Sequence, residues 1–196
     1  TIVLKDVVSR KKITDVMMLQ SVVRFLADNI GNISVIKRIS DTMTSLGRKT
    51  TSHTIENYVS ALTDSYIFYP VQRYDAKGKQ LLKTGQKLYL ADVGLRQVIN
   101  GTKGGDLGHV LENIVYLELA RRGGEIYVGK AGDAEIDFVV IIGEHKAYYQ
   151  VSLSVRDETT MQRELAPLKS ISDNFPKYLL TLDNDPVQFP DGIKPE

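Results

Sequence analysis

The chain of 196 residues contains no cysteine. This absence excludes disulfide bonds and thiolate metal sites, and it favours the cytoplasm as the compartment. No apolar run approaches the roughly 20 residues of a membrane-spanning helix, and we find no secretory leader. The chain opens on Thr1 and stops abruptly at Glu196, so we expect it to be an excised piece of a longer protein.

Several enzyme motifs are also missing. No hydrolase nucleophile elbow occurs, and His53, His109 and His145 are too scattered for a paired zinc motif. The glycines of residues 101–105 precede an expected helix, but their spacing fits neither a Walker A loop nor the dinucleotide fingerprint. We therefore interpret this segment as a linker between two domains, residues 1–100 and 101–196.

The net charge of +1 conceals opposite charges in the two halves. Residues 1–90 hold 14 Lys and Arg against 7 Asp and Glu, whereas residues 91–196 hold 11 against 17. A basic half can face a phosphate backbone, and an acidic half argues against nucleic acid running over it. The alternative is that the halves attract each other or a neighbouring domain.

The first half changes from helical periodicity to the alternation of a strand. The expected elements are helices at residues 13–30, 34–46 and 51–62, and strands at residues 66–73 and 87–90. The turn residues 75–78 join the two strands into a hairpin. Three helices followed by a basic hairpin resemble a winged helix-turn-helix domain.

In such domains the third helix often enters the major groove of DNA, while the hairpin contacts phosphates. The expected DNA-binding cations lie just before the third helix and in the hairpin: Arg48, Lys49, Arg73, Lys77, Lys79, Lys83 and Lys87. Against this interpretation, the third helix carries Glu56 and Asp64, which phosphates would repel. The alternative is that this domain packs against a partner domain.

The second half begins with a helix that is predicted to start at Asp106 and to stop at Gly123. Its apolar residues follow the spacing of one buried stripe: Leu107, Val110, Leu111, Ile114, Val115 and Leu119. Glu112 lies at the border of that stripe. Its carboxylate is therefore expected to be half-turned toward whatever the helix packs on.

The strands expected after this helix carry two further polar residues. Asp137 is an acid in a strand that is apolar on both faces, and Gln150 lies on the next strand. Packing of the helix on this sheet would bring Glu112, Asp137 and Gln150 together. A helix at residues 157–168 and another strand at residues 178–182 follow.

This arrangement resembles the PD-(D/E)XK nuclease-like fold, in which a helix Glu, a strand Asp and the first residue of an (E/D/Q)-X-K tripeptide bind a divalent metal. The resemblance implies that Glu112, Asp137 and Gln150 are the catalytic and metal-binding positions, with Mg²⁺ as the ion. Ser152 replaces the family's lysine and lacks the charge that stabilises the attacking water. Lys146 lies four residues from Gln150, which is about 13 Å along a strand, and this is too far for it to substitute for that lysine. The resemblance therefore implies a degenerate site with weak Mg²⁺ binding, at which hydrolysis is not expected.

Four phrases, at residues 69–75, 89–96, 108–113 and 135–138, are similar to the C-terminal region of prokaryotic AAA-superfamily ATPases. Those proteins carry a P-loop module, then a winged helix, then a nuclease-like domain of unknown function. The resemblance implies an α/β (α+β) fold, with an N-terminal winged helix-turn-helix and a restriction-endonuclease-like domain built on a mixed sheet. The ATP-binding module would be a partner elsewhere in the parent chain, so no nucleotide site is expected here.

These observations lead to three hypotheses. The first is a non-catalytic region of a cytoplasmic ATPase that binds nucleic acid or docks a partner. The second is a Mg²⁺-dependent DNA endonuclease with an altered tripeptide. The third is a protein-interaction module of a toxin-antitoxin or defence system.

Overall fold

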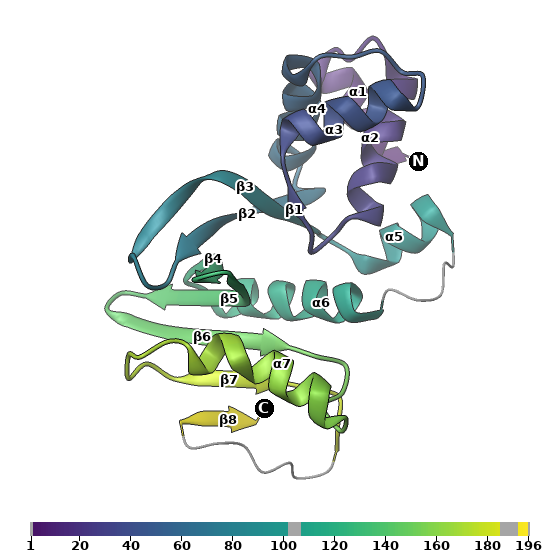
Figure 1. Ribbon diagram of the computed structural model, residues 1–196. Helices are drawn as coiled ribbons and strands as arrows, with labels where there is room; N and C mark the ends of the chain where they lie inside the picture. The colour runs from purple at the N-terminus through teal and green to yellow at the C-terminus, as the bar shows by residue number, and fades with distance from the viewer. Residues whose placement is uncertain (1, 102–106, 185–191, 196) are drawn as a thin grey trace. The chain divides into compact units, whose positions relative to one another are not determined.

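The computed structural model describes residues 2–101, 107–184 and 192–195 (Figure 1). Within these ranges, seven helices and eight strands form an α/β fold with a mixed sheet, which confirms the predicted fold class. The chain divides into two compact units. The first comprises Thr1–Pro70 and Gln86–Lys103, and the second comprises Val71–Gly85 and Gly104–Glu196.

The first unit is mainly helical. Its helices are α1 (Ile2–Lys11), α2 (Val16–Asp28), α3 (Ile36–Ser45), α4 (Ser52–Asp64) and α5 (Val93–Asn100). Side-chain caps fix where three of them begin, and the cap of α5 is Asp92, whose carboxylate accepts the N–H of Gly94 at 2.7 Å. The Asp15 carboxylate accepts the N–H of Met18 at 2.8 Å, and the Thr51 hydroxyl accepts that of Thr54 at 3.2 Å. The expected helices are therefore present, but they start later than their apolar periodicity suggests.

The predicted hairpin is formed by β2 (Phe68–Asp75) and β3 (Gln80–Leu90). A short strand that the sequence did not reveal, β1 (Ile33–Ser34), pairs antiparallel with residues Gln86 and Lys87 of β3. The turn is fixed by Asp75, whose carboxylate accepts the N–H groups of Lys77 and Gly78, each at 3.0 Å. The hairpin thus leaves the first unit and places its tip in the second.

A single apolar core holds the first unit together. It is built from the facing sides of α2, α3 and α4 and from the inner ends of β2 and β3; its fully buried members include Leu19, Leu26, Ile39, Ile55, Leu62 and Phe68. The buried positions on each helix recur at three- and four-residue intervals, as helical periodicity requires.

The second unit combines sheet and helices. Its elements are α6 (Leu107–Arg122), β4 (Glu125–Ala131), β5 (Ala134–Ile142), β6 (His145–Val151), α7 (Glu158–Lys169), β7 (Lys177–Leu180) and β8 (Ile193–Pro195). The strands β4, β5 and β6 form an antiparallel meander, whereas β7 runs parallel to β6 and β8 runs parallel to β7. The end of β2 adds to this sheet by pairing parallel with β4.

The helices α6 and α7 cover opposite faces of this sheet. Leu165 and Leu168 of α7 join a core that contains Tyr148 of β6. On the other face, Phe138 of β5 lies 6.3 Å from Tyr116 of α6 between ring centroids, and Phe138 pairs with Tyr149, the neighbour of Tyr148. Successive residues of a strand point to opposite faces, so the two helices are separated by the sheet.

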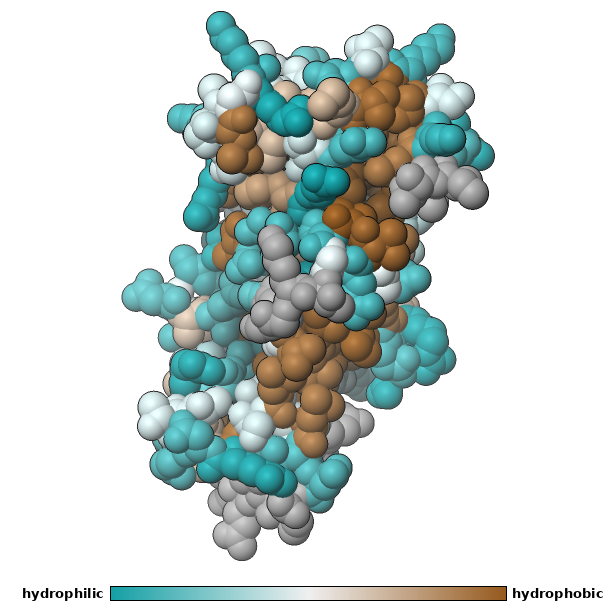
Figure 2. All heavy atoms as spheres, turned by 90° about the vertical axis from the view of Figure 1, so that its right-hand side faces the viewer, coloured by the Kyte–Doolittle hydropathy of each residue, from teal (hydrophilic) through white to brown (hydrophobic). Residues whose placement is uncertain are grey.

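The buried stripe predicted for α6 is confirmed at Leu119 and wrong at Leu107 and Ile114. The side chains that face the interior are Glu112, Asn113, Tyr116 and Leu119, whereas Leu107 and Ile114 are 65% and 46% exposed. The helix is therefore rotated relative to the prediction, because it buries a polar pair together with an aromatic ring. On the face of the molecule that Figure 2 draws, hydrophobic residues gather in patches at the surface.

Some predictions fall on residues that the structure does not describe. The helix cap at Asp106 and the linker residues 102–105 lie outside the described ranges. In the part of the chain that is described, no helix has the length and hydropathy that crossing a bilayer would require.

Candidate functional site

Two of the three predicted site residues, Asp137 and Gln150, lie side by side. The β5–β6 register pairs Phe138 with Tyr149, so the next residues along, Asp137 and Gln150, face each other. The backbone N–H of Asp137 donates to Gln150 Oε1 at 3.4 Å, and the carboxylate of Asp137 accepts the N–H of Val151 at 2.8 Å. Both side chains therefore hold the two strands together.

A β-bulge lies at this point of β5. Tyr127 of β4 pairs with Val139, but Gly129 pairs with Ile136, so β5 contains one more residue than β4 over this interval. Gly129 is needed opposite the bulge, because an added Cβ would lie 2.8 Å from Val139 Cγ2 and 2.9 Å from Ile136 Cβ. Bulges locally redirect side chains and are frequent near active sites.

Gln150 also contacts α7. Its amide nitrogen donates to Glu164 Oε2 at 2.9 Å, and Glu164 Oε1 accepts from Arg163 at 2.8 Å. The Glu164 side chain is only 13% exposed, so this carboxylate depends on the amide and guanidinium donors around it. Gln150 thus uses its oxygen toward β5 and its nitrogen toward α7.

Glu112 is buried on α6, with 7% of the residue exposed. Nδ1 of His109 lies 3.5 Å from its carboxylate, one helical turn away. Since α6 and α7 cover opposite faces of the sheet, Glu112 approaches from one side and the Gln150 amide is directed to the other. The meeting of all three predicted ligands at one metal ion stays a prediction.

Ser152, which replaces the family's lysine, and Lys146, the nearby cation, both make other contacts. The hydroxyl of Ser152 donates to the carbonyl of Ser154 at 3.1 Å. The ammonium group of Lys146 donates to the hydroxyl of Tyr74 at 3.0 Å and lies over the rings of Tyr74 and Phe175, 4.9 and 5.4 Å from their centroids. Lys146 therefore belongs to an aromatic cluster.

Metal binding also stays a prediction. In residues 2–101, 107–184 and 192–195, no three His, Asp or Glu side chains form a group that could hold an ion. The oxygen of Gln150 and the carboxylate of Asp137 are hard ligands of the kind that suit Mg²⁺, but each also accepts a backbone hydrogen bond.

The predicted DNA-binding cations differ in accessibility. Lys49, Lys77, Lys79 and Lys83 are exposed, and Arg48 and Arg73 are half-buried. Nε of Arg73 is buried without a hydrogen-bond partner among the described residues. Lys87 was expected to be an accessible wing cation, and this is wrong: the residue is only 2% exposed, because it lies in the pairing of β3 with β1.

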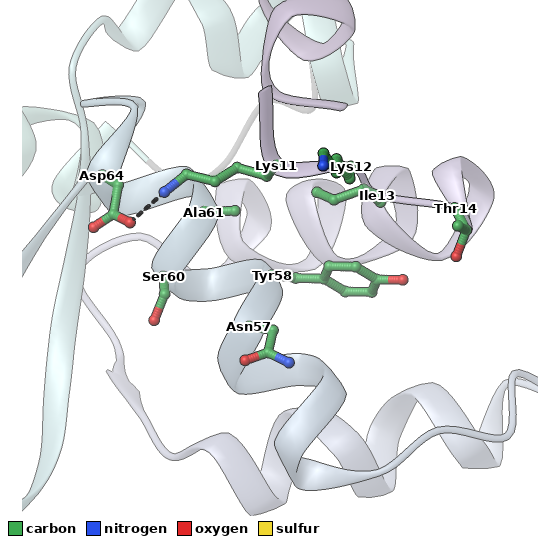
Figure 3. Close-up of a pocket in the computed structure, with 9 residues that line it drawn as sticks. All are labelled: Lys11, Lys12, Ile13, Thr14, Asn57, Tyr58, Ser60, Ala61 and Asp64. Atoms are coloured by element: carbon green, nitrogen blue, oxygen red, sulfur yellow. Dashed lines mark hydrogen bonds and ion pairs between the residues drawn. The ribbon is translucent and has the colours of Figure 1, made fainter. Parts of the chain in front are cut away.

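A pocket of about 380 Å³ lies beside α4 in the first unit (Figure 3). Asn57 and Ser60 line it from α4, and Lys11 and Lys12 line it from the end of α1. Nζ of Lys11 lies 2.6 Å from the carboxylate of Asp64, as the dashed line in Figure 3 shows. This ion pair neutralises one of the two acids that argued against a phosphate contact.

Sequence reasoning missed the partners of the site, namely Glu164 and Lys11. Glu164 lies on a predicted helix, whereas Lys11 lies in residues 1–12, for which no helix was predicted. Their contacts join residues 14 and 53 positions apart. Helical periodicity identifies the face of a helix and does not identify the residue it meets. A polar side chain among the inward-facing residues of the segment 157–168 was the one available signal for Glu164.

Comparison with known proteins places this α/β chain in a family. The chain belongs to the family described as "Domain of unknown function (DUF8612)", which matches residues 1–105. An uncharacterized protein of Haemophilus influenzae is 40% identical over 181 residues, covering 92% of this chain and 44% of that protein. An uncharacterized protein of Methanocaldococcus jannaschii is 30% identical over 185 residues, covering 92% of this chain and 39% of that protein.

The chain thus spans less than half of the length of either curated relative. No solved structure matches it.

Proposed function

We propose that this chain is a non-catalytic, nucleic-acid-binding region of a larger cytoplasmic ATPase of the AAA superfamily, with a degenerate nuclease-like site. Its first unit acts as a winged helix-turn-helix domain, and α4 is the helix that enters the groove. The resemblance to those ATPases supports the parent protein, and the greater length of the relatives leaves room for an ATPase module. The exposed polar face of α4 supports nucleic-acid binding, and the hydrogen bond from Gln150 to Glu164 supports a degenerate site.

The observation that carries the degenerate site is the hydrogen bond from Gln150 to Glu164. A glutamine can donate to a carboxylate, whereas a glutamate at this position would place two acids at hydrogen-bond distance. The amide at position 150 thus matches the carboxylate of its neighbour on α7. The same amide accepts from Asp137 N–H, so both of its polar atoms serve the structure.

Nucleic-acid binding is supported by the accessible face of α4. This face is polar and exposes His53, Glu56, Asn57 and Ser60. Asn side chains can read base edges, and cations beside a helix can contact phosphates. Arg48 and Lys49 precede α4, and Lys12 at the pocket carries no ion pair among the residues described.

The backbone of Lys12 supports its part in this face. Its φ of 52° lies in the left-handed region, which is unfavourable for a residue with a side chain. The fold keeps this conformation where α1 ends, beside the exposed residues of α4. A phosphate held there would sit close to side chains that can reach bases.

Fluorescence anisotropy with duplex DNA tests this proposal. The affinity is expected to fall between about 50 and about 200 mM salt, because phosphate contacts release counterions. Replacing Arg48 and Lys49 by alanine is expected to lower the slope of log K against log salt by about 2. The matched control replaces Lys37 and Arg38, an exposed pair on α3 of the same unit. Equal losses in both variants would contradict the role of α4.

Failure to bind duplex or single-stranded DNA at any salt concentration would instead favour a partner-docking module. The endonuclease alternative is tested by nicking of supercoiled plasmid with Mg²⁺ or Mn²⁺. The proposal predicts that the plasmid stays intact. Loss of supercoiled DNA that disappears in Asp137→Ala would overturn it.

A further inference from the structure

A second pocket, of about 600 Å³, lies in the second unit. Its walls come from two segments that are far apart in the sequence. The β2–β3 turn contributes Lys77 and Lys79, and the segment that follows α7 contributes Ser170, Ser172 and Asp173. A volume in the range of about 300–1,000 Å³ is typical of small-molecule sites.

One wall presents two cations from a fixed turn. The carboxylate of Asp75 accepts the N–H groups of Lys77 and Gly78, and these bonds hold its pKa below the ordinary value. Gly78 itself is confined, because an added Cβ would lie 2.9 Å from the Asp75 carboxylate. The two lysines are thus carried by a turn of defined shape, while their ammonium groups remain exposed.

The other wall presents a carboxylate that is also fixed. The hydroxyl of Tyr148 donates to Asp173 Oδ2 at 2.6 Å, and the N–H of Phe175 donates to Oδ1 at 3.3 Å. Nζ of Lys177 donates to the carbonyl of Asp173 at 2.8 Å and lies 4.0 Å from Oδ1. A carboxylate has about four acceptor positions, so two remain for a ligand.

We propose that this pocket binds a nucleoside monophosphate, either free or at the phosphorylated end of a strand. Lys77 and Lys79 receive the phosphate, because ammonium groups form charge-assisted hydrogen bonds with its oxygens. Asp173 accepts the ribose hydroxyls, and the serines supply further polar contacts. A free phosphate ion would use the lysine wall alone, whereas a nucleotide uses both walls.

Isothermal titration calorimetry of the 196-residue chain with AMP tests this assignment. The double variant Lys77→Ala/Lys79→Ala is expected to weaken AMP binding about a hundredfold, about tenfold for each lysine. The matched control is Lys83→Ala, which removes the same charge from the same hairpin but does not line the pocket. Unchanged affinity in the double variant, or an equal loss in the control, would overturn the proposal.

Three further ligands sharpen the result. Adenosine is expected to bind at least tenfold more weakly than AMP, and inorganic phosphate likewise. Equal affinity of phosphate and AMP would overturn the nucleotide assignment. A single-stranded octamer with a 5′ phosphate, compared with its 5′-hydroxyl form, distinguishes a strand end from a free nucleotide.

The role of Asp173 has its own readout. The unsubstituted chain is expected to prefer AMP over its 2′,3′-dideoxy analogue. The Asp173→Asn variant is expected to lose that preference while retaining phosphate binding. Retention of the preference in Asp173→Asn would contradict the ribose contact. This pocket is separate from the face of α4, so either proposal can fail without the other.

Discussion

The first unit carries exposed cations next to a polar helix face, whereas the predicted site residues Asp137 and Gln150 of the second unit bond within their own sheet and to α7. Arg48 and Lys49 stand before α4 without being absorbed into the core, and Lys12 lies in a pocket beside it. In the second unit, Asp137 accepts a backbone N–H and Gln150 bridges β5 to Glu164. The difference is in line with our proposal that the first unit contacts nucleic acid, and it shows that Asp137 and Gln150 make contacts that hold the second unit together.

The largest effect is expected from a substitution that creates a cavity in the core of one unit, because it tests whether the two units are independent. Phe138 is fully buried on β5, so Phe138→Ala is expected to lower the free energy of unfolding by about 3–5 kcal/mol. Hydrogen exchange measured by mass spectrometry should show the loss of protection in β4–β6. Leu62→Ala, a buried site in α4, is the matched change in the first unit. Equal loss of protection in both units would show that they unfold as one.

The role of Gln150 can be tested by introducing an acid, which the (E/D/Q)-X-K tripeptide of the similar fold also allows at this position. Gln150→Glu is expected to destabilise the chain by about 1–3 kcal/mol, because two carboxylates would meet near 2.9 Å. Glu164→Gln in the same chain should recover most of the loss, as urea denaturation would show. If Gln150→Glu were neutral and cleavage of plasmid appeared, the site would be an active nuclease site instead.

Crowding at the bulge in β5 is expected to give an effect of similar size. Gly129→Ala is expected to cost about 1–3 kcal/mol, since its methyl group would collide with Val139 and Ile136. Gly108→Ala on α6 is the control, with no atom within 4 Å of its added Cβ, and should stabilise by about 0.4–1 kcal/mol. Thermal unfolding of both variants measures the difference. Equal shifts would show that Gly129 is not closely packed.

Lowering the pH should destabilise mainly the second unit, and this is the smallest of the predicted effects. Hydrogen bonds from Arg121 and Arg122 lower the pKa of Glu118 to about 2, and the Val155 N–H lowers the pKa of Asp183. A depressed pKa stabilises the fold above the unfolded value of about 4 and loses that contribution as the pH falls toward about 2. Urea midpoints measured across this window should fall less steeply in Glu118→Gln. An identical slope would contradict the Glu118 contribution.

Local sequence signals were sufficient for most elements of the fold. Asp15, Thr51 and Asp92 are capping residues placed directly before α2, α4 and α5, and each accepts a backbone N–H near the start of its helix. The strands β1 and β8 were missed because they contain two and three residues. So short a run has no detectable alternation, and pairing partners decide whether it is a strand.

The candidate site was less predictable than the fold. The adjacency of Asp137 and Gln150 follows from strand alternation and the short β5–β6 turn. The burial of Glu112 with Asn113, in place of Leu107 and Ile114, does not follow from periodicity, because a polar pair is not expected on an inner face. The bond from Gln150 to Glu164 depends on how α7 returns over the sheet, which no local pattern encodes.

The additional residue in β5 shifts the pairing of β5 with β4 but leaves its pairing with β6 in register. Along β6, the pairing from Phe138 to Ile142 is uninterrupted, while along β4 the count shifts by one between Val139 and Ile136. A deletion of one residue at this position would straighten the ladder with β4, but it would displace Asp137 from Gln150. A single-residue deletion here therefore cannot both remove the irregularity and keep the polar pair.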